Sequence, residues 1–199
     1  MKKALPVGIE NFQDMVQNGY CYVDKTLFIK ELLDLKGKVN LFTRPRRFGK
    51  TLNLSMLRYF FEDTGNEEAN AENKELFKNL KIMEAGGDYA GQMGSYPVIN
   101  LTLKSAKQPT FEAAYGKIKN EIAEEFKRHR YIADSVKIDA DDRKSFQRIA
   151  GGKGECGDYS GSLKFLSKCL YQATGKKTVI LLDEYDVPLE NAYFRGFYG

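Results

Sequence analysis

The chain has 199 residues, of which 42% are hydrophobic and 13% aromatic, so it is globular rather than a disordered tail. Its formal net charge of +4 permits an anionic ligand without requiring nucleic acid. Three scattered cysteines (Cys21, Cys156, Cys169) and one histidine, His129, argue against a zinc site and Cys/His catalysis, and they fit a reducing cytoplasm. The sequence shows neither an apolar leader nor an apolar run approaching ~18 residues, which predicts a cytoplasmic protein without a membrane span.

Residues 1–36 are predicted to form a lead-in segment before the core. Short extended pieces joined by Asn18-Gly19 are expected first. Phe12 and Tyr22 are interpreted as core residues, although a segment in this place could also fold over the base of a bound nucleotide. Apolar residues at helical spacing then predict a helix that Gly37 ends.

The next segment combines a strand, a tight loop and a helix. The apolar run from Val39 to Phe42 predicts a buried strand that ends before Arg44-Pro45, and a helical pattern restarts after Gly49-Lys50-Thr51. This order is typical of a phosphate-binding P-loop, in which backbone N–H groups and the positive end of the helix dipole point at a polyphosphate. Lys50 would reach the β- and γ-phosphates of a nucleotide such as ATP, and the Thr51 hydroxyl would ligate Mg²⁺.

The loop departs from the pattern G-x-x-x-x-G-K-[ST] at its first position, where Arg44 replaces glycine. Arginine does not readily adopt positive φ, and Pro45 has no N–H to donate. We therefore expect a different entry turn, with the amides of residues 47–51 as the cradle. Taken alone, Gly-Lys-Thr is common by chance, and its alternative interpretation is a helix start that carries a snorkelling lysine. The predicted nucleotide-binding residues are Arg46, Arg47, Phe48, Gly49, Lys50, Thr51 and Leu52.

The middle of the chain predicts mostly helices. Residues 64–75 are acidic and predict a solvated loop or short helix, and Pro97 to Leu103 predicts a second strand. A long helix from Thr110 to about His129 carries a basic end, which we interpret as a solvated face rather than a polyanion site. Helix capping by the aspartates from Asp139 is expected before the next helix, and a further helix ends at Gly175.

Thr178 to Glu184 predicts an apolar strand that ends in two carboxylates. Four consecutive apolar residues are typical of a central parallel strand covered on both faces. Because ligands in open α/β sheets bind beyond the carboxyl ends of strands, Asp183 would hold Mg²⁺ through a water, and Glu184 would accept a proton from the attacking water. The alternative for this pair is an ordinary acidic strand end. Asp186 and Pro188 are expected to begin the next helix.

Three motifs in this order resemble the bacterial AAA-ATPase-like proteins: Tyr22-Val23-Asp24-Lys25-Thr26, the loop from Arg44 to Thr51, and Leu182-Asp183-Glu184-Tyr185-Asp186-Val187-Pro188. The resemblance runs from the first residues to the last, and the family's P-loop also has arginine at the position of Arg44. It implies a P-loop NTPase fold of the additional-strand class, an α/β three-layer sandwich with a mainly parallel sheet. It also implies ATP binding by the loop Gly49–Thr51, with magnesium and hydrolysis roles for Asp183 and Glu184.

That family's sheet has the order 5-1-4-3-2, with two strands after the Asp-Glu strand, and often a nuclease domain of the PD-(D/E)XK type at the C-terminus. The sequence ends soon after the Asp-Glu strand. We therefore expect a single domain over residues 1–199, with a nucleotide-binding core from 37 to 199, an incomplete sheet and no nuclease domain. Three explanations for the missing strands are left open: a truncated gene product, a fragment, or a variant sheet in which the loop strand and the Asp-Glu strand pair directly.

Three hypotheses for function follow. The first is a Mg²⁺-dependent ATPase in which Lys50 and Glu184 are catalytic, with Arg46 or Arg47 offsetting phosphate charge. The second is a non-hydrolysing nucleotide-binding or interaction module that works with a protein partner, or with a second copy of the chain, supplying the missing strands. The third is a nucleic-acid-binding protein that uses the arginines of the loop and the helix end near Arg130.

Overall fold

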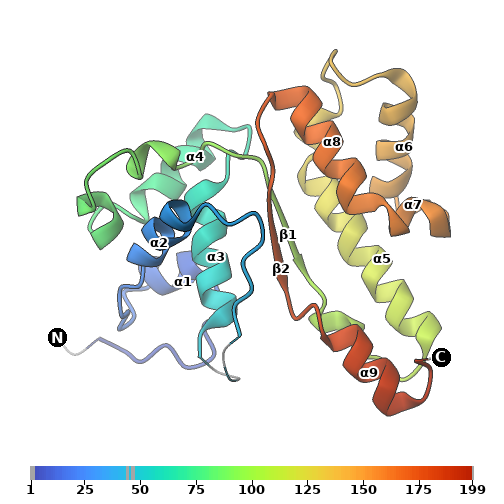
Figure 1. The fold of residues 1–199 in the computed structure, drawn as a ribbon, viewed down its shortest axis with the longest axis horizontal. Helices are drawn as coiled ribbons and strands as arrows, with labels where there is room; N and C mark the ends of the chain where they lie inside the picture. Colours follow the sequence, from blue (N-terminus) through green and yellow to red (C-terminus); the bar gives the residue numbers. More distant parts are fainter. Residues whose placement is uncertain (1–2, 44, 46–47, 199) are drawn as a thin grey trace. The chain divides into compact units, whose positions relative to one another are not determined.

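A computed structural model describes residues 3–43, 45 and 48–198 (Figure 1). The chain divides into two compact units, Met1–Tyr96 and Pro97–Gly199, and each is described by itself. In the described ranges, none of the helices combines the length and the apolar composition that a membrane crossing needs. The assignment of the whole chain to one domain stays a prediction.

The first unit is helical and is built around an aromatic core. Phe12, Phe60 and Phe77 are fully buried, and the ring centroid of Phe77 lies 4.9 Å from that of Phe12 and 5.3 Å from that of Phe60. Such clusters combine a large buried apolar area with favourable ring geometry, so they hold the short helices together. The helices are α1 (Phe12–Gln17), α2 (Leu27–Leu35), α3 (Lys50–Phe61) and α4 (Glu67–Glu75), followed by 3₁₀ turns at Lys81–Glu84 and Ala90–Gln92.

Helix α1 corrects the expectation of extended pieces at the N-terminus. The Asn11 side chain caps this helix by accepting hydrogen bonds from the backbone N–H groups of Gln13 and Asp14, at 2.8 and 3.2 Å. Phe12 and Met15 lie three residues apart on its buried face. Capping and burial of this face therefore outweigh the turn signals on either side.

The second unit is of the α/β class, with a parallel strand pair beside helices. Its strands are β1 (Val98–Thr102) and β2 (Val179–Asp183), and the register pairs Val98 with Val179 and Thr102 with Asp183. The strands predicted at Pro97 to Leu103 and at Thr178 to Glu184 are confirmed. The helices are α5 (Phe111–Arg128), α6 (Ala140–Ala150), α7 (Cys156–Ser160), α8 (Ser162–Thr174) and α9 (Val187–Arg195), with 3₁₀ turns at Lys104–Ala106 and Arg130–Ile132. Asp139 caps α6, as expected from the sequence.

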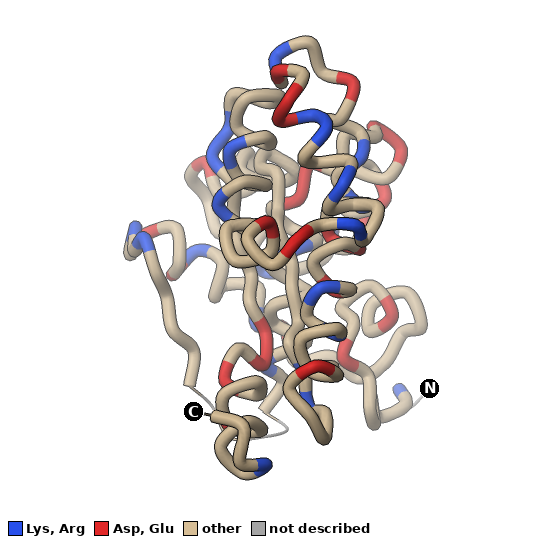
Figure 2. Tube along the Cα trace, turned by 90° about the vertical axis from the view of Figure 1, so that its right-hand side faces the viewer, with Lys and Arg blue, Asp and Glu red and all other residues tan. Residues whose placement is uncertain are grey.

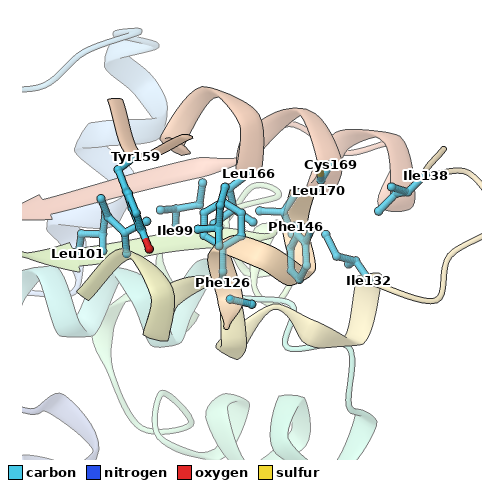
Figure 3. Packing of buried hydrophobic residues seen from close by; sticks show 13 residues of the cluster. Ile99, Leu101, Phe126, Ile132, Ile138, Phe146, Tyr159, Leu166, Cys169 and Leu170 are labelled. Atoms are coloured by element: carbon cyan, nitrogen blue, oxygen red, sulfur yellow. The ribbon is translucent and has the colours of Figure 1, made fainter. Parts of the chain in front are cut away.

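The core of the second unit lies on one face of the strand pair. Figure 3 shows side chains from β1, α5, α6 and α8 packed together in this cluster. Alternate β1 residues, Ile99 and Leu101, point into it and are buried against residues such as Phe126 and Leu166. The second unit therefore holds β1 firmly against its helices.

The two outer edges of this sheet differ. Val179 N donates to Pro97 O, and Leu103 N donates to Asp183 O, so the odd-numbered residues of β2 bond to β1. Because N–H and C=O groups alternate in direction along a strand, those of Ile180 and Leu182 point to the outer edge of β2. The side chains of Ile180 and Leu182 are 44% and 40% exposed, whereas Leu181 is buried. The prediction of a strand covered on both faces is therefore wrong, because only the face that carries Leu181 is buried in the described chain. The prediction of a central position is also wrong there, because β2 pairs with β1 alone.

The outer edge of β1 is closed by side chains from the end of α5. Glu125 Oε1 accepts from Asn100 N at 2.7 Å, and His129 Nε2 donates to Val98 O at 3.0 Å. Arg128 also donates to Val98 O and forms an ion pair with Glu125. The prediction that this basic end is a solvated face is therefore wrong for Arg128. The spacings Glu125/Arg128 and Glu125/His129 are the sequence signal that could have indicated such pairs.

Candidate functional site

The first half of the candidate site is the start of α3. Gly49 has φ +73°, a left-handed conformation that glycine adopts without strain, and α3 begins at the next residue. A Cβ atom at Gly49 would have open space around it, so the backbone conformation and not crowding requires glycine. Lys50 and Thr51 consequently stand in the first turn of a 12-residue helix. N–H groups in a first turn have no acceptor within the helix and suit an anionic ligand.

Helix α3 is fixed in place by the core of the first unit. Phe12 N donates to Ser55 Oγ at 2.9 Å, and both Met56 and Phe60 are fully buried. Lys50, Thr51 and Leu52 lie before this anchored part and are half-buried. The helix thus presents its first turn from a rigid element, which favours a fixed binding geometry.

The segment before the loop differs from its prediction. Residues 39–42 form no strand, and Val39 and Leu41 are 89% and 64% exposed. An apolar run becomes a strand only where a neighbouring strand supplies hydrogen-bond partners, and in the described chain this run has none. Phe48 is exposed as well. The predicted phosphate contacts of Arg46 and Arg47, and the entry residue Arg44, lie outside the described residues.

The motif Tyr22-Val23-Asp24-Lys25-Thr26 has a structural explanation in the first unit. The Asp24 carboxylate accepts from Thr26 N at 2.8 Å, from Thr26 Oγ1 at 2.7 Å and from Lys81 N at 2.8 Å. Ile82 N in turn donates to the buried Thr26 hydroxyl at 3.1 Å. Partial burial acts to raise the pKa of Asp24, but these hydrogen bonds outweigh it and hold the pKa below its ordinary value. This motif therefore fastens the start of α2 to the turn at Lys81–Glu84.

The second half of the candidate site is the end of β2. Asp183 closes the strand opposite Thr102, and Glu184 follows with φ +54°, an unusual conformation for a residue with a side chain. Glu184 N donates to Asp183 Oδ1 at 3.1 Å, and Val187 N donates to Glu184 O at 3.1 Å. These bonds turn the chain directly into α9. The prediction of a helix start at Asp186 and Pro188 is confirmed.

The predicted residues thus form two local groups, one in each unit. Lys50 and Thr51 belong to the first unit, and Asp183 and Glu184 belong to the second. The donor chemistry fits a magnesium nucleotide, since an ammonium suits phosphate while hydroxyl and carboxylate oxygens are preferred ligands of Mg²⁺. Figure 2 shows basic and acidic residues interspersed along the trace. The candidate residues are therefore distinguished by their places at a helix start and a strand end, and not by a concentration of charge around them. The joint action of the two groups stays a prediction.

Comparison with known proteins identifies the family. A family model described as "Predicted AAA-ATPase" matches residues 6–196. The chain belongs to this predicted AAA-ATPase family. Both halves of the candidate site lie within the matched range, and membership of the predicted AAA-ATPase family supports nucleotide binding in general.

One curated relative is similar to most of this chain, and its name states no activity. The "Uncharacterized protein in vnfD 5'region" of Azotobacter chroococcum mcd 1 is 28% identical over 189 residues, which cover 94% of this chain and 30% of that protein. The chain therefore spans about a third of the length of the curated relative it matches. No solved structure matches the chain.

Proposed function

We propose that the chain binds ATP with Mg²⁺ and that this binding supports hydrolysis. In this proposal Lys50 and the N–H groups at the start of α3 hold the β- and γ-phosphates, with Arg46 and Arg47 offsetting their charge. Thr51 and Asp183 hold the metal, and Glu184 accepts a proton from the attacking water through its carboxylate. Bound Mg²⁺ supplies further neutralisation of phosphate charge.

The backbone conformation of Glu184 is the observation that carries the proposal. A residue other than glycine costs about 1–2 kcal/mol in the left-handed region, and such strain concentrates at functional sites. Glu184 bears this strain at the carboxyl end of a parallel strand, directly after the acidic Asp183. Open α/β sheets place their ligands at this end of the strands. A structural turn alone would more readily carry glycine or asparagine at this position.

The same proposal extends to the fold. The parallel pairing of β1 with β2 supports an additional-strand P-loop sandwich, in which the Asp-Glu strand lies next to the strand that precedes it in sequence. The alternative is a non-hydrolysing nucleotide-binding or interaction module, in which Glu184 does not act on water.

Thermal unfolding with and without Mg-ATP tests binding. ATP at ~100 times its Kd should raise the free energy of unfolding by about 2.7 kcal/mol in the unmodified chain. Lys50→Ala should weaken binding at least ~10-fold, or about 1.4 kcal/mol. Lys38→Ala, which removes an exposed lysine outside the proposed machinery, should leave the shift unchanged. An unmodified chain without any nucleotide-dependent shift would contradict the proposal.

Phosphate release then separates hydrolysis from binding. Glu184→Gln removes the proton acceptor while keeping the side-chain volume, so turnover should fall by about 10²–10⁴-fold while the ATP-dependent shift persists. Binding without turnover in the unmodified chain would favour the interaction module instead.

A further inference from the structure

The left-handed backbone of Glu184 depends on support from outside its own turn. A strained conformation persists only where the surrounding structure leaves the residue no alternative. The two hydrogen bonds already described, from Glu184 N to Asp183 Oδ1 and from Val187 N to Glu184 O, join residues at most three positions apart. Such local bonds do not fix the direction in which α9 leaves β2. The constraint must therefore come from a segment that is distant in the sequence.

The segment that follows β1 contacts this turn on both sides. Leu103 N donates to Asp183 O at 3.0 Å, directly before Glu184. The 3₁₀ turn at Lys104–Ala106 packs against α9, which follows Glu184 (Figure 1). The last residue of this 3₁₀ turn is fully buried, so the segment is held by the core of its unit. Residues 103–108 can therefore act as a fixed support for the chain between β2 and α9.

Asn191 joins α9 to this support. Asn191 is 6% exposed, and its Nδ2 donates to Gln108 O at 2.6 Å, across 83 residues of sequence. Gln108 is itself held in place, because its Nε2 donates to Ser105 O at 3.0 Å. Asn191 lies four residues after Val187, so both residues stand on the same face of α9. A buried amide that lost its acceptor would carry a desolvation cost, so this bond resists rotation of α9.

We propose that Asn191 is a positioning residue for Glu184. Its hydrogen bond to Gln108 O fixes α9 against residues 103–108 and thereby holds Glu184 in the left-handed conformation, which aims the carboxylate. Without this bond, α9 would turn and Glu184 would relax towards an ordinary backbone conformation. A displacement of ~1 Å at a catalytic group can lower a rate by about 10²-fold. The backbone effect stands without nucleotide, whereas its effect on hydrolysis rests on the function proposed above.

Thermal unfolding of the full chain without nucleotide tests the backbone effect. Glu184→Gly should raise the unfolding midpoint by about 2–8 °C, because glycine adopts this conformation without strain. In a chain that carries Asn191→Ala, the same substitution should gain at most about half of this shift, because Glu184 has already relaxed. Asn191→Asp keeps the side-chain volume and removes the donated bond, so it should act like Asn191→Ala. Either of the two variants decides the comparison if far-UV circular dichroism shows that its fold is retained.

Ser162 provides the matched control for this comparison. It is also buried in the second unit, and its Oγ donates to a backbone carbonyl, Tyr159 O, at 2.7 Å. Ser162→Ala removes a comparable hydrogen bond away from the turn, so Glu184→Gly should keep its complete gain in that chain. An equal gain from Glu184→Gly in the Asn191 and Ser162 variants would overturn the proposal.

Steady-state ATP turnover tests the catalytic consequence. Asn191→Ala should lower kcat by about 10- to 100-fold and leave KM within ~3-fold, because the proposed phosphate contacts of Lys50 belong to the other unit. Ser162→Ala should leave both constants unchanged. A coupled unfolding cycle together with an unchanged kcat would show that Asn191 shapes the turn without positioning the carboxylate, which would also overturn the proposal. An unmodified chain without turnover would contradict the function proposed above, while the unfolding cycle would still decide whether Asn191 holds Glu184.

Discussion

The two strands of the sheet have outer edges of opposite character. The edge of β1 is closed from within the chain, by Glu125, Arg128 and His129 at the end of α5. The edge of β2 presents the backbone groups of Ile180 and Leu182 without such cover in the described chain. Buried backbone groups need partners, so side chains complete the first edge, whereas the second depends on water or on another strand. The comparison indicates that side chains of its own unit complete the edge of β1, whereas the described residues of that unit give the outer edge of β2 no such cover.

The largest effect is expected from removing the cover of β1. Glu125→Ala should lower the free energy of unfolding by about 3–5 kcal/mol, because it leaves Arg128 and the Asn100 amide without their carboxylate. Glu124 is next to Glu125 in the sequence and forms an exposed ion pair with Lys127. Glu124→Ala should therefore lower the free energy of unfolding by at most about 1 kcal/mol. Urea unfolding measures both variants, and equal losses would show that the carboxylate does not hold this edge.

A smaller effect is expected from pH. Burial lowers the pKa of His129, and the neighbouring Arg128 acts in the same direction, while Glu125 opposes them. Below about pH 6.5, His129 therefore takes up a proton in the unfolded chain but not in the folded chain. The free energy of unfolding falls as the pH drops from this value towards the pKa of His129 in the folded chain. The slope should approach about 1.4 kcal/mol per pH unit. His129→Gln should flatten the profile between pH ~7 and ~5.5 in urea unfolding, and a profile identical to that of the unmodified chain would contradict this explanation.

The smallest effect is expected at the open edge itself. Leu182→Lys should change the stability of the monomer by no more than about 0.5 kcal/mol, because the side chain is already partly exposed. It should also lower the tendency to aggregate, since a charge on an edge strand opposes pairing. Thermal unfolding and light scattering distinguish these outcomes.

The sequence could predict elements whose signals are local. The apolar run before Asp183 and the helix start after Gly49 were both predictable, and both are found. The run from Val39 to Phe42 carries a similar local signal but forms no strand, because strand formation requires a partner that a local pattern does not reveal. An open edge on the Asp-Glu strand was expected from the incomplete sheet, but the exposure of the Ile180 and Leu182 side chains was not, because it depends on what packs against that face.

The candidate site shows the same limit. Lys50 and Asp183 could be selected from motifs, since their spacing to the helix start and strand end is local. The hydrogen bond from Lys81 N to Asp24 could not, because it joins segments far apart in the sequence. The left-handed backbone of Glu184 could not either, because no glycine or asparagine at this position signals it. Asp24 lies in a segment that resembles a motif of the family, yet its contacts hold the start of α2 to the turn at Lys81–Glu84. A motif alone therefore does not tell whether a residue contacts a ligand or stabilises the fold.

The left-handed backbone at Glu184 sets two kinds of selection against each other. A laboratory screen for heat resistance alone should enrich glycine or asparagine at position 184, since both relax the turn between β2 and α9. A screen for ATP turnover should return glutamate, at the expense of that added robustness. The residue enriched in each screen would show whether glutamate at this position serves catalysis or the stability of the turn.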